Sequence, residues 1–217
     1  MSKTVTTLLL SMFTLCGTIL LYAQNDNTTT NYTNKKEMER EKKVLVAFFS
    51  HTGENYAVGN IKKGNTHIVA EMIAERTNGK LFEIVPVKPY PKTYDACVEI
   101  AKKEKARKVH PAFKTDIAVE NYDTIFIGYP NWWGDMPMIV YTFLEKHQWQ
   151  GKTVIPFCTH EGSGLSDTEQ YIADNCKGAT VEKGLAIRGN TAQNKQEEAK
   201  QSVEKWLSQL KTSTATR

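Results

Sequence analysis

Residues 43–49 read KVLVAFF, and residues 50–53 follow as SHTG. A run of apolar, β-branched and aromatic residues that stops at a turn of Ser, Thr and Gly predicts a strand buried on both faces. Residues 64–66 read GNT and lead into HIVAEMIA at residues 67–74, where the apolar positions recur with helical spacing. This stretch therefore predicts a buried strand, a hydroxyl-rich loop and the N-terminus of a helix, in that order.

The loop between this strand and this helix has the composition of an anion-binding site. Free backbone N–H groups and the helix dipole point at one spot, and Ser50, Thr52, Asn65 and Thr66 add polar side chains. We interpret the loop as a phosphate cradle. Such residues are also routine in ordinary turns, so this loop alone does not establish a site.

An insertion at residues 54–63 interrupts the cradle. Its position allows His51, Glu54 or Asn55 to approach a ligand, or allows the insertion to cover one. The role of the insertion is left open by the sequence.

Residues 1–23 differ from the rest of the chain. Lys3 precedes a mostly apolar stretch that is short for a membrane span, and Ala23 suits cleavage before Gln24. We predict a signal peptide at residues 1–23 and an exported, periplasmic protein with no membrane span after processing. An uncleaved N-terminal anchor is the alternative. Cys16 also suggests a lipoprotein. The bulky Leu15 before it disfavours this alternative, because a lipoprotein processing site has a small residue there.

Composition narrows the class of protein. The chain has 217 residues, 40% of them hydrophobic and 24% charged, which is typical of a globular protein with one domain and additional segments. The 28 Lys and Arg exceed the 24 Asp and Glu by four, and no basic and aromatic stripe indicates a nucleic-acid partner. Cys97, Cys158 and Cys176 lack the spacing of a metal site and allow at most one disulfide among themselves.

The remaining elements follow in a regular alternation. The polar residues 24–42 predict a flexible linker, and the folded domain spans residues 43–210, with a disordered tail at 211–217. Strands are expected at residues 80–86, 122–130, 151–158 and 179–187. Helices are expected at 94–107, 137–147 and around Val203, Trp206 and Leu207, and Ser166 to Glu169 reads as a capping box that opens another helix.

Five strands that alternate with helices require a parallel sheet covered on both faces. The chain is too short for an eight-stranded barrel. We therefore predict an α/β fold of three layers. Basic residues gather on one side of the helix at 94–107 and indicate either a solvated surface or a partner-docking patch: Lys102, Lys103, Lys105, Arg107 and Lys108.

Three loops leave the carboxyl ends of the predicted strands, where open α/β sheets bind their ligands. The first is the cradle. The second offers two adjacent indoles, and the third offers glycines and short polar side chains. An anion cradle, a stacking plate and groups for ring edges together suit a planar, phosphorylated, heteroaromatic ligand. The second loop comprises Pro130, Asn131, Trp132, Trp133 and Gly134, and the third comprises Thr159, His160, Glu161, Gly162, Ser163 and Gly164.

These loops, in this order, resemble those of flavodoxins, and more narrowly those of bacterial flavodoxin-like proteins with YPNWW and THEGSG loops. The resemblance covers residues 43–210. It implies a three-layer fold of strand order 2-1-3-4-5 and non-covalent FMN that carries electrons. It also implies that the phosphate loop corresponds to Ser50, Thr52, Gly64, Asn65 and Thr66. The mildly basic chain and the leader depart from the usual cytosolic, acidic flavodoxin.

Details of the site follow from the same resemblance. Adjacent side chains diverge, so one of Trp132 and Trp133 is expected to cover the ring while the other packs or shields. Gly134 and Gly162 would let a peptide turn when the flavin gains a proton. Asp135 and Glu161, if near the ring, would lower its reduction potential. Each loop also has a simpler reading, as core packing or as a strand-to-helix turn.

Three classes of function remain open from the sequence. The first is an electron carrier that exchanges electrons with redox partner proteins. The second is an FMN-dependent oxidoreductase that takes hydride from NAD(P)H and reduces a quinone or another small-molecule acceptor. The third is a binding module without redox turnover. The sequence shows no second dinucleotide fingerprint, although a second site can be built without one.

Overall fold

The computed structural model describes residues 42–215. The predicted signal peptide at 1–23 lies outside the described residues, as does the predicted linker at 24–42 apart from Lys42. No helix within the described residues is both long enough and apolar enough to cross a membrane.

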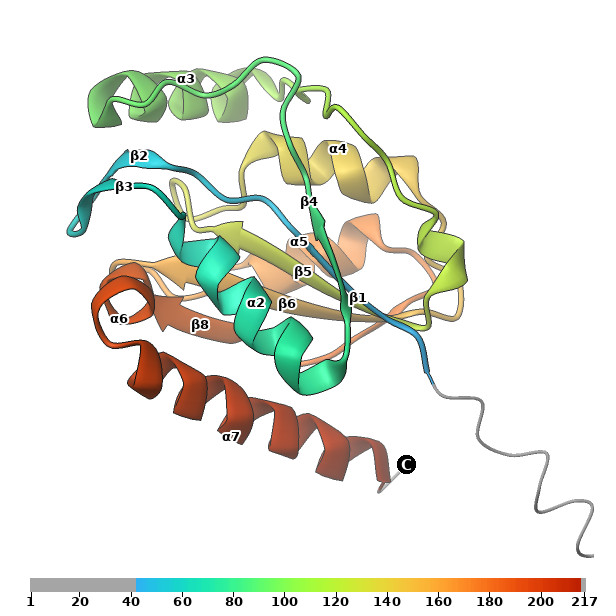
Figure 1. Cartoon of the computed structure of the whole chain (residues 1–217). Helices are drawn as coiled ribbons and strands as arrows, with labels where there is room; N and C mark the ends of the chain where they lie inside the picture. The colour runs from blue at the N-terminus through green and yellow to red at the C-terminus, as the bar shows by residue number, and fades with distance from the viewer. Residues whose placement is uncertain (1–41, 216–217) are drawn as a thin grey trace, which may run out of the picture. The chain divides into compact units, whose positions relative to one another are not determined.

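A six-stranded parallel sheet forms the centre of the domain (Figure 1). Its strands are β1 (Val44–Phe48), β4 (Lys80–Glu83), β5 (Thr124–Pro130), β6 (Thr153–His160), β7 (Thr180–Val181) and β8 (Leu185–Arg188). They lie in the order β4-β1-β5-β6-β7, and β8 also pairs with β6. Counted along the chain, this is the predicted order 2-1-3-4-5, which confirms the three-layer flavodoxin-like fold.

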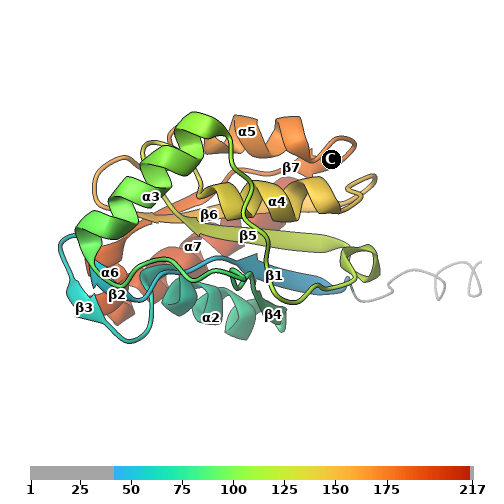
Figure 2. The ribbon, with the colours of Figure 1, turned by 90° about the horizontal axis from the view of Figure 1, so that it is seen from above.

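Helices cover both faces of the sheet (Figure 2). One face carries α2 (Asn65–Thr77), α6 (Gly189–Asn194) and α7 (Gln196–Ala215), and the other carries α4 (Met138–Lys146) and α5 (Thr168–Asn175). Helix α3 (Tyr94–Arg107) lies on the same side as α4, and a single 3-10 turn, η1 (Val119–Asn121), precedes β5.

Two hydrophobic cores explain why the central strands lack polar alternation. In β1, Leu45 and Ala47 pack into the core under α4 and α5, whereas Val46 and Phe48 pack into the core under α2 and α7. Since both sets of side chains are fully buried or nearly so, every position of such a strand must be apolar.

The expected fifth strand at 179–187 is two short strands instead. Between them the backbone N–H of Gly184 donates to Glu169 Oε1 at 2.7 Å. This contact also explains why the predicted capping box is wrong: Glu169 is turned toward the β7–β8 link, and α5 begins at Thr168 with no side-chain cap.

Other boundaries differ as well. Helix α7 continues to Ala215, into the segment 211–217 predicted as a disordered tail. The insertion at 54–63 contributes to an antiparallel hairpin, β2 (Gly53–Asn55) and β3 (Gly59–Ile61), which the sequence analysis did not anticipate. The cysteines of the described part, Cys97, Cys158 and Cys176, are buried and unpaired.

Candidate functional site

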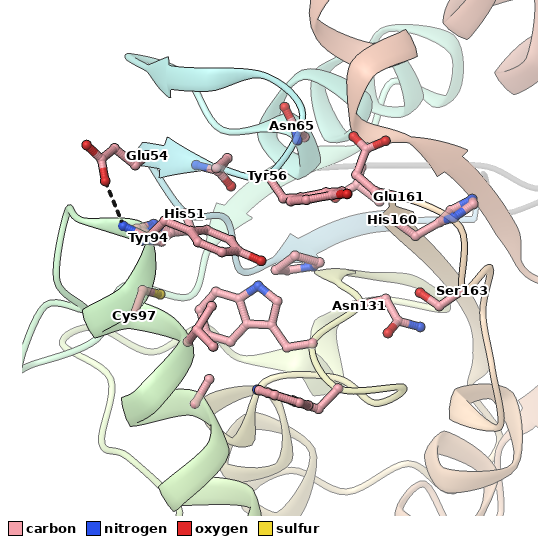
Figure 3. Close-up of a pocket in the computed structure, with 17 residues that line it drawn as sticks. His51, Glu54, Tyr56, Asn65, Tyr94, Cys97, Asn131, His160, Glu161 and Ser163 are labelled. Carbon is pink, nitrogen blue, oxygen red and sulfur yellow. Dashed lines mark hydrogen bonds between the residues drawn. The ribbon is translucent and has the colours of Figure 1, made fainter.

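A cavity of about 400 Å³ opens at the carboxyl ends of β1, β5 and β6 (Figure 3). Its walls come from the loops after these strands, the β2–β3 hairpin, the first residue of α2 and one side of α3. The lining residues are His51, Glu54, Asn55, Tyr56, Asn65, Tyr94, Cys97, Val98, Ala101, Pro130, Asn131, Trp132, Trp133, Thr159, His160, Glu161 and Ser163.

Most of the predicted site residues therefore meet at one cavity. Those that line it are His51, Asn65, Pro130, Asn131, Trp132, Trp133, Thr159, His160, Glu161 and Ser163. The others are not among the lining residues: Ser50, Thr52, Thr66, Gly134, Gly162 and Gly164.

The hydroxyl groups of the predicted cradle are used within the chain. Ser50 Oγ accepts a hydrogen bond from the backbone N–H of His67 at 3.1 Å, and Thr66 Oγ1 lies 2.8 Å from Thr159 Oγ1. Thr52 Oγ1 accepts a hydrogen bond from Lys92. These hydroxyls brace the loop against α2, β6 and the segment before α3.

Gly64 allows this loop to close tightly. A Cβ at this position would lie 2.2 Å from Ser50 Oγ and 2.4 Å from the carbonyl oxygen of His51, so a side chain cannot fit without moving the backbone. The glycine thus lets residues 50 and 51 approach the N-terminus of α2, where Gly64 is the N-cap residue.

His51 is a buried polar side chain of the cavity wall. Only 7% of its surface is exposed. Its Nδ1 lies 2.8 Å from the carbonyl oxygen of Thr52, which can only accept, so Nδ1 carries the proton. Burial, with a smaller effect of the Lys92 charge, lowers its pKa to about 4. The ring is therefore neutral near pH 7 and its Nε2 is a hydrogen-bond acceptor.

Two buried polar atoms of the cavity wall have no hydrogen-bond partner among residues 42–215, the part of the chain that the structure describes. They are Nε2 of His51 and Oδ1 of Asn65. Buried polar groups are almost always paired in folded proteins, and each unpaired one costs free energy. A polar ligand in the cavity could satisfy both atoms.

The second loop ends in a tight turn. Trp132 N donates to the Asp135 carbonyl at 2.8 Å, and Asp135 N donates back to Trp132 at 3.1 Å. The two indoles diverge as expected. Trp132 packs edge-on against Phe49 and Tyr90, with ring centroids 5.5 and 5.2 Å away, whereas Trp133 is 51% exposed.

Asn131 joins the second and third loops. Its Nδ2 donates to the carbonyl of Gly164 at 2.9 Å and to Ser166 Oγ at 3.0 Å. Its Oδ1 accepts from the backbone N–H of Gly134 at 3.1 Å. The Asn131 amide thus fixes the distance between the second and third loops. Both loops were predicted to contact the edges of a ring.

The third loop is arranged by its own side chains. Gly162 N donates to His160 Nδ1 at 2.9 Å, so that nitrogen is unprotonated. Burial, with a smaller effect of Arg188, lowers the pKa of His160. Glu161 Oε1 accepts from Asn190 N at 2.7 Å while the residue lines the cavity.

The two acidic residues that were expected near a ring differ in placement. Glu161 lines the cavity, but Asp135 is not among the lining residues. Asp135 is 7% exposed and is bonded by Tyr141 and Lys105.

The insertion lines the cavity through the hairpin, as one of the alternatives left open by the sequence allowed, whereas the wall made by α3 was not predicted. Figure 3 shows that Glu54 reaches the start of α3, where its Oε2 accepts a hydrogen bond from Tyr94 N at 2.9 Å. On α3 itself, Cys97, Val98 and Ala101 line the cavity. The insertion was the sequence signal for part of this wall, since it interrupts a ligand loop.

Known proteins support the same architecture. The family model described as Flavodoxin matches residues 43–209. A structure of a candidate flavoprotein from Bacteroides uniformis is 31% identical, with a TM-score of 0.59, and the match covers 76% of this chain and 99% of the other. No curated protein matches the chain.

Two further structures are similar. A candidate flavoprotein from Bacteroides eggerthii is 28% identical with a TM-score of 0.62, covering 77% of this chain and 97% of its own. A Lactobacillus acidophilus flavoprotein in complex with FMN shares the fold at 24% identity and a TM-score of 0.53, covering 71% and 98%. Because the family model spans most of the chain and the sheet order agrees, this protein belongs to the flavodoxin family.

Proposed function

We propose that the cavity binds FMN and that the protein carries electrons through this flavin. The observation that carries the proposal is a pair of buried atoms, His51 Nε2 and Asn65 Oδ1, which none of the described residues satisfies, in a cavity at the carboxyl edge of a flavodoxin sheet. Its volume lies within the usual range for ligand pockets, about 300–1,000 Å³. The FMN complex of the Lactobacillus acidophilus flavoprotein supports the choice of ligand.

The described residues suit the parts of this ligand. The N-terminus of α2 offers backbone N–H groups to a phosphate, and Asn65 sits on its first turn. The exposed indole of Trp133 offers a flat apolar face beside the cavity. Peptide groups of the second and third loops are placed for polar ring edges. FMN would supply the redox chemistry, and the chain would bind and orient it.

One side chain, His51, has a specific role in this proposal. Because its Nδ1 donates to Thr52, its Nε2 can only accept while the ring is neutral. We propose that it accepts a hydrogen bond from an O–H or N–H group of the flavin. A ligand with such a donor forms a hydrogen bond with this buried acceptor and therefore binds more tightly.

A second candidate is reduction of a small acceptor by NAD(P)H. The observation that favours it is the extra wall from α3 and the hairpin, which gives one side of the cavity an apolar lining. A carrier that serves a protein partner should oxidise NAD(P)H slowly with or without a quinone. An oxidoreductase should turn over NAD(P)H when a quinone is added.

Binding of FMN to the purified apoprotein tests the proposal. Titration followed by flavin fluorescence should show saturable binding by the wild type. His51→Leu should raise the Kd by about tenfold, the effect of losing about 1.4 kcal/mol from a hydrogen bond to a buried group. His51→Gln should stay closer to wild type because it keeps an acceptor.

The control is His110→Gln, since His110 is exposed and bonded to Glu145 at 2.7 Å. It should bind FMN like the wild type. An apoprotein that remains colourless and takes up no FMN would refute the proposed function.

A further inference from the structure

The turn that carries Trp133 has an unusual backbone for its sequence. Trp133 has φ 59° and Gly134 has φ 71°, and the flanking residues Trp132 and Asp135 exchange both backbone hydrogen bonds. Positive φ at both central residues is the signature of a type I′ turn, whose first central position favours Asn, Asp or Gly. A bulky residue at positive φ is a steric outlier and costs free energy.

Helix α3 holds this turn at two points. Lys105 Nζ donates to the carbonyl oxygen of Trp133 at 2.7 Å. One turn earlier on the helix, Lys102 Nζ lies 5.6 Å from the centroid of the Trp133 ring, within the range of a cation–π interaction. Both the backbone and the indole of the strained residue therefore contact the same face of α3.

The same lysine also serves a buried acid at the end of the turn. Lys105 Nζ lies 3.3 Å from Asp135 Oδ2, while Asp135 Oδ1 accepts from Met136 N at 2.8 Å and Tyr141 Oη at 2.9 Å. A carboxylate at 7% exposure needs such partners because burial disfavours its charge. Lys105 thus connects α3 to the first central residue of the turn and to its last residue.

We infer that Lys102 and Lys105 are positioning residues that hold Trp133 in its strained conformation beside the ligand. The inference rests on the proposed function for the identity of the ligand. Strained residues cluster at functional sites, where the surrounding structure maintains them. Trp133 is half exposed, so the fold gains little from its burial, and its indole is kept at this position for the ligand that fills the cavity.

A substitution at Trp133 should affect the stability of the apoprotein and its affinity for FMN differently. Asn tolerates positive φ and is favoured at this turn position. Trp133→Asn should therefore raise the thermal midpoint of the apoprotein or leave it unchanged. The same variant should raise the Kd for FMN by about tenfold, as expected when an aromatic contact with a ring is lost.

Lys105→Met tests the positioning role directly, because it keeps the apolar stem and removes the ammonium. In the apoprotein, amide hydrogen exchange at Trp132 and Asp135, which pair across the turn, should be faster than in wild type. Lys105→Arg should restore part of the protection. The matched control is Lys103→Met. In the wild type the Lys103 ammonium lies 3.5 Å from Glu99 on the same helix. This variant should exchange like wild type.

A double variant tests whether Lys105 acts by holding the strained Trp133 or only through its charge. In a Trp133→Gly background the strain is absent, so Lys105→Met should accelerate exchange less than it does in wild type. Equal acceleration in both backgrounds, or exchange in Lys105→Met that matches Lys103→Met, would overturn the inference. Both readouts use the apoprotein, so they stand even if FMN fails to bind and the proposed function falls.

Discussion

At the scale of single residues, His51 links the fold to the proposed chemistry. Its position after β1 buries the ring, and Nδ1 is committed to the carbonyl of Thr52. The remaining nitrogen has no hydrogen-bond partner within the described part of the chain. Burial and the nearby charge of Lys92 both disfavour the protonated ring, which lowers its pKa to about 4 from an ordinary value of 6.5.

This lowered pKa predicts a loss of stability in acid. Between pH 6.5 and pH 4 the unfolded chain binds a proton at His51 and the folded chain does not, so falling pH favours unfolding. The contribution is roughly 3 kcal/mol across this window. Urea unfolding of the apoprotein at pH 7 and pH 4.5 should show a larger loss for wild type than for His51→Gln. Equal losses would contradict the assigned pKa.

The residue scale also shows where prediction from sequence reaches its limit. Ser50 and Thr66 were predicted as cradle residues because hydroxyls can bind phosphate, and the structure adds that these hydroxyls also bond His67 and Thr159. Residue type indicates which groups can bind a ligand. Which of them stays free depends on contacts between elements that are distant in the chain, and the sequence does not contain those contacts explicitly.

At the scale of elements, the hairpin and α3 together build one wall of the cavity, of which the sequence suggested only the part made by the insertion. Glu54 N donates to the Lys92 carbonyl at 2.7 Å, and Glu54 Oε2 accepts from Tyr94 N. On the far side, Asn190 Nδ2 lies 3.5 Å from the Ala57 carbonyl. The hairpin thus connects the start of α3 with α6 beside the cavity.

Glu54→Ala should loosen this connection. The carboxylate satisfies a free N–H at the N-terminus of α3, a position where a cap is worth about 1 kcal/mol. We expect the free energy of unfolding to fall by about that amount and the Kd for FMN to rise, because Tyr94 lines the cavity. Glu99→Gln, on the same helix but away from its N-terminus, should leave the Kd unchanged. A Glu54→Ala variant with wild-type stability would contradict the capping role.

Elements differ in how well the sequence predicts them, for physical reasons. β1 and β5 were found because strands buried on both faces leave an uninterrupted apolar run. The hairpin and the short α6 were missed because neither has a core face long enough to produce a period. The expected cap at Ser166 failed because Glu169 has a better-placed donor in Gly184.

At the scale of the whole molecule, topology explains why the cavity lies where it does. The chain goes from β1 to β4 on one side and then to β5 on the other, so the strand order reverses between β1 and β5. Loops diverge at such a point and leave a crevice beyond the carboxyl ends of the strands. The alternation of strands and helices predicted this location correctly, since it depends on connection rules and not on individual contacts.

A crystal structure of the protein with FMN tests the central claim most directly. The account predicts the flavin in the cavity between the second and third loops, with one of its donors within hydrogen-bond distance of His51 Nε2 and its ring in contact with an indole of residues 132–133. The account would be contradicted by a complex in which this cavity stays empty while FMN binds elsewhere, or in which His51 Nε2 remains without a partner.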